Sequence, residues 1–255
     1  MRNAGKFQAG WGTIIFFIFI VAFVSSSIVS SVAATEPLRM LTVEMAPFGF
    51  FTKDDKDTGL LYEIANRIAV ETGLSHTNSV VPFARMIEEL RFGNADCSIF
   101  FLSKANEKVA VKIASVVPFK NVIIGPGGTT FDSLKSLHGK VVASVRRAVY
   151  DEAFTSDTAI EKYQTKDYHH SIRMLMHNRV DAMVGPEIGL YFTAGAMGYS
   201  KKDFGKPLVL NTKDAWLQFS RKTADEKKTA ALKAAIERLL KKNVFQEFVN
   251  KYTDN

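Results

Sequence analysis

The stretch GLLYEIANRIAVETG, residues 59–73, has the spacing of a helix with one buried face. Its apolar positions fall three and four residues apart, at Leu61, Ile64, Ala65, Ile68 and Ala69. Gly73 follows the last of them, and glycine is a common residue just beyond a helix end. Short apolar segments flank the helix at residues 41–44 and 78–81 and have the length of strands. This order predicts a strand–helix–strand unit with parallel strands.

The same alternation continues along the chain and then restarts. Pro82 opens a second helix that closes at Gly93, and residues 95–101 read as a buried strand. Further strands are expected at 121–124, 141–145, 180–184, 209–210 and 215–220, and helices at 131–137, from 150, at 169–178, 187–197 and 224–252. Two similar halves result. The final strand and helices have no sheet of their own, so we expect them to return to the first half.

This arrangement predicts an α/β fold of two lobes, each with a mostly parallel sheet, and a cleft between them. Lobe one is expected to comprise residues 35–118 and 213–255, and lobe two residues 119–212. The chain would cross between the lobes near residues 117–122 and 210–216, as two hinge strands. Clefts of this kind, at the carboxyl ends of parallel strands, are a favoured place for small ligands.

Residues 1–34 have the pattern of a cleaved signal peptide. Arg2 and Lys6 precede 12 apolar residues at 13–24, and a stretch of small residues ends at Ala34. A retained membrane anchor is the alternative, but a span needs about 20 apolar residues. We therefore expect a soluble, periplasmic mature chain.

Composition narrows the class of protein. Of the 255 residues, 47% are hydrophobic and 23% charged, which excludes disorder and collagen. The formal net charge of +7 allows a nucleic-acid or membrane-surface binder, but without a long basic run we rank that class last. A single cysteine, Cys97, excludes an intramolecular disulfide and a cysteine zinc finger. His170 and His177 lack a third ligand, so neither a metal nor a cofactor is expected.

Five short segments are informative when they are taken together in their order along the chain. They are MAPF at 45–48, TGLLYE at 58–63, LRFGNAD at 90–96, RVDA at 179–182 and FSRK at 219–222. Together they resemble the bacterial extracellular solute-binding proteins of family 3, from about residue 38 to residue 252. The resemblance implies a periplasmic binding protein fold that captures a small polar ligand, amino-acid-like or an organic anion. It also implies an ABC permease or a membrane receptor as partner, and closure around a ligand favours a monomer.

Two segments depart from the pattern of the amino-acid binders in that family. Those binders carry Thr-x-x-Arg after a lobe-one strand, and its Arg clamps the ligand carboxylate. Here residues 103–108 read SKANEK, with Lys108 as the nearest cation. The family's lobe-two Asp, which takes the ligand ammonium, is replaced by Glu187 with a shift of one position. These departures leave the choice between an amino acid and another solute open.

The candidate ligand contacts follow expected strand ends. Phe48 lies in a loop after the first strand and either stacks on the ligand or packs on the lobe core. Phe101 and Ser103 end the last strand of the first run, at the rim of the cleft. Arg85 lies one turn into a helix, where a positive charge is unfavourable against the helix dipole. That cost favours a role for Arg85 in ligand binding, and a solvated side chain is the alternative.

The second lobe supplies the remaining candidates. Arg146 and Arg147 follow the strand at 141–145 and precede a helix start, and backbone N–H groups at helix starts bind anions. The alternative for this pair is solvation at the lobe edge. Glu187 is placed to meet a ligand cation, or serves only as an acid that complements a helix N-terminus.

An enzyme on the same fold, such as a dehydratase-like lyase, is the alternative function. Catalysis would need an acid or base with a tuned pKa in the cleft. Glu187 and Glu63 are the only candidates, and no nucleophile–base pair is evident. A binding protein without catalytic residues is therefore the leading hypothesis.

Overall fold

Strands and helices alternate along the computed structural model, which describes residues 36–101, 107–146, 148 and 150–253. The strands are β1 (Leu38–Val43), β2 (Phe50–Phe51), β3 (Asp57–Thr58), β4 (His76–Val81), β5 (Cys97–Phe101), β6 (Ala110–Ile124), β7 (Val141–Val145), β8 (Glu161–Thr165), β9 (Ala182–Pro186) and β10 (Leu208–Ser220). The α-helices are α1 (Leu60–Thr72), α2 (Phe83–Phe92), α3 (Glu152–Ser156), α4 (Tyr168–Met176), α5 (Glu187–Ala196), α6 (Glu226–Lys241) and α7 (Val244–Thr253). Two 3₁₀ turns, η1 (Leu134–Leu137) and η2 (Lys201–Asp203), complete them.

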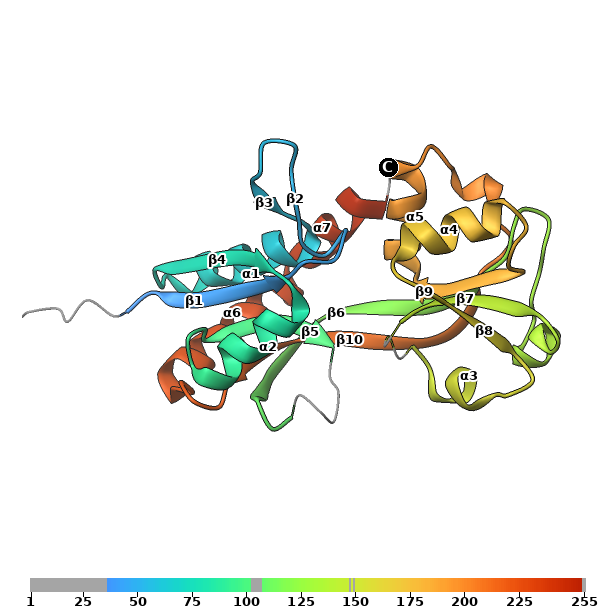
Figure 1. The fold of residues 1–255 in the computed structure, drawn as a ribbon. Coiled ribbons are helices and arrows are strands. Elements are labelled where there is room, and N and C mark those ends of the chain that lie inside the picture. The colour runs from blue at the N-terminus through green and yellow to red at the C-terminus, as the bar shows by residue number, and fades with distance from the viewer. Residues whose placement is uncertain (1–35, 102–106, 147, 149, 254–255) are drawn as a thin grey trace, which may run out of the picture. The chain divides into compact units, whose positions relative to one another are not determined.

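The main sheet has eight strands and contains two groups of parallel strands. Its order is β4-β1-β5-β10-β6-β9-β7-β8. The neighbours β1, β4 and β5 are parallel, as are β7, β8 and β9. Between these groups run the long strands β6 and β10, antiparallel and side by side (Figure 1). The α/β fold with mostly parallel strands is confirmed, but the two expected sheets are joined into one because β6 and β10 pair along nearly their whole length.

Strand directions make the carboxyl ends of the two parallel groups face each other along β6. Each of the pairs β5–β10, β10–β6 and β6–β9 is antiparallel, so β9 runs opposite to β5. The end of β5, Phe101, is level with Ala215 and so with Val117 of β6. The end of β9, Pro186, is level with Asn121. The two ends are thus four residues apart along β6, or about 13 Å at the usual rise per residue.

The buried side chains form two cores. The first core gathers β1, β5, α1, α2 and the terminal helices, and the second gathers β7, β9, α3 and α4. Helix α5 belongs to both, because Ile188 packs in the first core while Leu190 and Ala194 pack in the second. The lobe boundaries expected from the sequence stay a prediction.

Several expected elements are confirmed with their ends. Gly73 and Gly93 close α1 and α2 with φ values of 75° and 80°, the left-handed conformation that glycine adopts without strain. The strands expected at 209–210 and 215–220 are one strand, β10, whose register shifts at three places. The hairpin β2–β3 and the edge strand β8 were not expected; β8 reads EKYQT, and only its Thr165 is buried.

The expected signal peptide lies outside the described residues. Within the part of the chain that the structure describes, no helix is long and apolar enough to cross a membrane.

Candidate functional site

The first strand group is β1, β4 and β5, with the loops and helices that follow them. Its site candidates are Phe48, Phe101 and Arg85. Phe101 ends β5, and Arg85 lies in α2, which follows the end of β4. Ser103 lies outside the described residues. The three described candidates lie at or after the carboxyl ends of strands, as the sequence predicts.

Phe48 belongs to the core rather than to an open surface. Its side chain is fully buried, with 0% of its surface exposed. The ring meets Phe119 at 5.0 Å and Phe101 at 6.2 Å between centroids, both edge-to-face, and Phe101 lies 5.8 Å from Phe119. Packing, the alternative considered from the sequence, therefore describes Phe48 in this structure, because a buried ring has no face to offer a ligand. The half-buried Phe101 keeps a partly open ring that Phe48 and Phe119 support.

Arg85 is a solvated cation on α2. Its side chain is 66% exposed, and Nε lies 3.5 Å from Oε1 of Glu89, one turn along the helix. An exposed pair of this kind contributes little to stability, so the guanidinium can exchange partners cheaply. Arg85 also lines a cavity of about 300 Å³ with Thr77 and Ser79 of β4 and with Arg39. Arg39 itself is committed, since it bonds both carboxylate oxygens of Asp96.

The loop after β7 differs from the expected open helix start. Arg146 is exposed, and its backbone N–H donates to the Thr165 carbonyl at 3.0 Å, while Arg147 lies outside the described residues. Helix α3 has only five residues, and its N-cap Asp151 accepts a hydrogen bond from Phe154 N at 2.9 Å. The helix start is less open than expected, because the Asp151 carboxylate already caps it, and an anion beside Arg146 and Arg147 stays a prediction.

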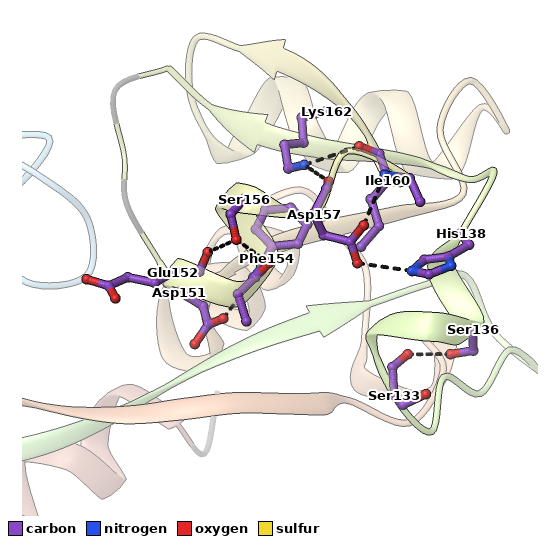
Figure 2. A network of polar contacts seen from close by, with 12 residues as sticks. Ser133, Ser136, His138, Asp151, Glu152, Phe154, Ser156, Asp157, Ile160 and Lys162 are labelled. Carbon is purple, nitrogen blue, oxygen red and sulfur yellow. Dashed lines mark hydrogen bonds and ion pairs between the residues drawn. The ribbon is translucent and has the colours of Figure 1, made fainter.

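Figure 2 shows how both ends of α3 are held by side chains. Asp157 follows the helix, and its Oδ2 lies 3.0 Å from Nε2 of His138. The ammonium of Lys162 donates to the carbonyls of Asp157 and Ile160. These contacts fix the helix whose cap borders the loop with Arg146.

Glu187 is the first residue of α5, directly after β9, and it is half-buried. Burial raises the pKa of Tyr191, and the nearby Glu187 carboxylate raises it further. The Glu187 side chain therefore lies close to Tyr191 at the facing strand end, where the sequence places it.

An amide network joins the two long strands to the cap of α3, and sequence reasoning missed it. Asn121 of β6 donates to Asn211 Oδ1 at 2.9 Å. Asn211 of β10 donates to the Tyr150 carbonyl at 2.9 Å and to Asp151 Oδ2 at 2.8 Å. Burial raises the pKa of Tyr150 to about 12, so its hydroxyl stays neutral and faces Tyr168 at 3.4 Å. An Asn within each of the two long strands is the signal that would have pointed to this network.

Glu63, a candidate acid/base group, is bonded to side chains of the terminal helix. Its carboxylate accepts hydrogen bonds from Lys251 Nζ at 2.7 Å and from the Tyr252 hydroxyl at 2.7 Å, both on α7. This cluster ties α1 to the terminal helix.

A metal site needs several ligating side chains close together. Among the described residues, no group of three or more His, Cys, Asp or Glu side chains is placed to hold a metal ion. His177 Nδ1 lies 2.8 Å from the Arg173 carbonyl, and Cys97 is fully buried.

Residues 38–255 match the model of the family "bacterial extracellular solute-binding proteins, family 3". The chain belongs to this family. A search of the curated proteins found no match.

Solved structures of substrate-binding proteins and of a sensor domain share the fold of this family 3 protein. One is the second substrate-binding domain of a putative amino acid ABC transporter from Streptococcus pneumoniae, with 17% identity over 85% of this chain and 99% of that one and a TM-score of 0.67. An ancestral arginine-binding protein bound to arginine has 18% identity over 85% and 97% of the chains and a TM-score of 0.66. A histidine kinase sensor domain has 14% identity over 85% and 96%, with a TM-score of 0.70.

Proposed function

We propose that this protein binds a small polar solute, amino-acid-like or an organic anion, between the facing carboxyl ends of its two groups of parallel strands. The family supports a solute-binding role. The strand register is the observation that supports this place of binding. It sets the ends of β5 and β9 four residues apart along β6, at Val117 and Asn121.

The side chains around this interval suit a small molecule with a charged group and an apolar part. Phe119 and Asn121 lie on one face of β6, because they are two residues apart in a strand. Phe119 brings the aromatic group with the half-buried Phe101, and Asn121 brings the amide network with Tyr150. We propose that Phe101 packs on the apolar part of the solute.

Charged residues of both strand groups are proposed to hold the polar part. Arg85 from the first group and Arg146 with Arg147 from the second are the cations, and Glu187 is the acid. A charge taken out of water needs a partner, since an unpaired buried charge costs several kcal/mol. A clamp drawn from both groups would couple binding to closure, because the second contact forms only when the halves approach.

Closure is proposed as a hinge motion of two lobes, residues 35–118 with 213–255 against residues 119–212. The lobes would bend about the middle of β6 and β10, which are the strands shared by both groups. A monomer suffices for this motion.

The loaded protein is proposed to dock on an ABC permease or on a membrane receptor from the periplasm, after removal of residues 1–34. Both kinds of partner are supported by likeness of fold, to a domain of a putative amino acid ABC transporter and to a histidine kinase sensor domain.

Thermal unfolding of residues 35–255 across a panel of amino acids and small organic acids tests the function. A ligand present at 100 times its Kd stabilises the fold by about 2.7 kcal/mol, which moves the unfolding midpoint by several degrees. We expect at least one compound of the panel to do so and to reduce the radius of gyration in solution scattering. Turnover of the stabilising compound, without compaction, would instead favour the lyase alternative.

A further inference from the structure

A second hollow lies at the opposite, amino edge of the second strand group. It has a volume of about 350 Å³ and is lined in part by Thr129, Thr130, Phe131, Lys140, Asn178 and Asp181. Lys140 and Asp181 directly precede β7 and β9, whose carboxyl ends carry Arg146 and Glu187. This amino-edge cavity is therefore separated from the proposed solute site by the length of the parallel strands.

The wall of the amino-edge cavity is built in advance of any ligand. The turn after β6 folds back so closely that a side chain at Gly125 would clash with Thr129 and Phe131. Isolated bridges join Pro126 to Phe204 and Thr130 to Lys206, so a second segment braces the turn. Phe131 is 8% exposed and gives the cavity an apolar side.

Several polar side chains line the amino-edge cavity, and those of Thr130, Asn178 and Asp181 are exposed. Within the described part of the chain, no hydrogen bond uses the side chains of Thr130 or Asn178. Lys140 Nζ and Asp181 Oδ1 are 4.0 Å apart, too far for a hydrogen bond, and their side chains are 42% and 44% exposed. The other oxygen of Asp181 accepts the Val141 N–H at 2.7 Å, which holds the carboxylate in place.

We propose that the amino-edge cavity is a second binding site, and that it takes a small zwitterion of the α-amino-acid class. A ligand carboxylate between these side chains would pair with the ammonium of Lys140 and accept hydrogen bonds from Thr130 and Asn178. The ammonium of the same molecule would meet Asp181 Oδ1, and a short aliphatic side chain would face Phe131 and Val180. The volume of about 350 Å³ lies at the lower end of small-molecule pockets, roughly 300–1,000 Å³, and leaves room for a small amino acid.

Site-resolved NMR of the isotope-labelled mature protein tests this site with glycine, L-alanine and L-serine as probes. We expect saturable shifts of the backbone amide signals of Thr130, Lys140 and Asp181 with at least one probe. Acetate and methylammonium carry one half of the zwitterion each, and each should bind more weakly than the amino acid. Lys140→Met keeps the aliphatic stem without the charge and should weaken binding at this site at least about fivefold. Lys135→Met is the matched control, since Lys135 is an exposed lysine of η1, and should change nothing.

Two outcomes would overturn the proposal. One is the absence of saturable shifts at these signals with all three amino acids. The other is binding in which acetate matches the amino acids and Lys140→Met has no effect, which would show a nonspecific surface anion effect. Shifts confined to signals around Asn121 and Arg146 count as the first outcome, since they report the proposed solute site alone.

Discussion

Asn211 Nδ2 donates a hydrogen bond to Asp151 Oδ2 at 2.8 Å and thereby ties strand β10 to the cap of α3. The same amide nitrogen donates to the Tyr150 carbonyl, and its partner oxygen accepts from Asn121 of β6. The interval of β6 and β10 proposed as the hinge is thus bonded directly to the loop that follows Arg146. Movement of this loop and bending of the two strands are expected to be coupled.

Asn211→Ala should destabilise the protein by about 1–3 kcal/mol. The change leaves the buried Asn121 amide and the Asp151 carboxylate with fewer partners, and unsatisfied polar groups carry a cost of this size. Urea unfolding measures it. Asn250→Ala, at an exposed asparagine bonded to Gln246, is the control and should lie within about 0.5 kcal/mol of wild type. Equal stability of the two variants would show that the network holds nothing.

Phe192→Ala should loosen the contact of α5 with the terminal helix. The Phe192 ring lies 5.5 Å from Phe50 and 6.1 Å from Tyr252, so it joins α5 to β2 and α7. The loss of a large, partly buried aromatic side chain should lower stability by about 2–3 kcal/mol. Hydrogen exchange of α7 amides should accelerate with it. Tyr163→Ala, at a residue 40% exposed on the edge strand β8, should leave α7 exchange unchanged. Unaltered α7 protection in Phe192→Ala would contradict the contact.

Asp96→Asn should remove part of the acid sensitivity of folding. Burial raises the pKa of Asp96, but hydrogen bonds, chiefly from Arg39, together with the charge of Arg39 bring the pKa below its ordinary value. A carboxyl group with a lowered folded pKa stabilises the protein above its unfolded pKa, near about 4. That stabilisation is lost as the pH falls through the folded pKa.

Denaturant unfolding between neutral and acid pH measures this contribution. Asp96→Asn should be less stable than wild type by about 2–3 kcal/mol at pH 7, and the gap should close in acid. The exposed Asp132→Asn is the control and should keep the wild-type pH dependence. A gap that persists at the lowest pH would assign the loss to packing rather than to charge.

Most of the helices and strands could be predicted from local sequence patterns. The helix at 59–73 could be predicted because its apolar spacing and its closing Gly73 agree, and the same holds for α2 and Gly93. Strands β6 and β10 could be predicted only in pieces, because their register with each other is a long-range property and polar residues interrupt the apolar pattern of both strands. For the same reason the pairing that joins both strand groups into one ladder was not visible.

The places of the candidate residues in the fold could be predicted, but their surroundings could not. Phe101, Arg146 and Glu187 follow strand ends, as alternating strands and helices indicate. The burial of Phe48 depends on Phe119, which is 71 residues further along the chain. The cap at Asp151 was missed because the helix it starts is only five residues long, too short for a periodic signal.

Calorimetric titration of the best-stabilising ligand measures whether cations of both strand groups hold the solute. Arg85→Ala should weaken binding at least about tenfold, and removal of both Arg146 and Arg147 should do at least as much, since about 1.4 kcal/mol corresponds to that factor. Lys227→Ala, at an exposed lysine of α6, should leave the affinity unchanged. Unchanged affinity in both Arg85→Ala and the double arginine variant would contradict a solute clamped as an anion between the two strand groups.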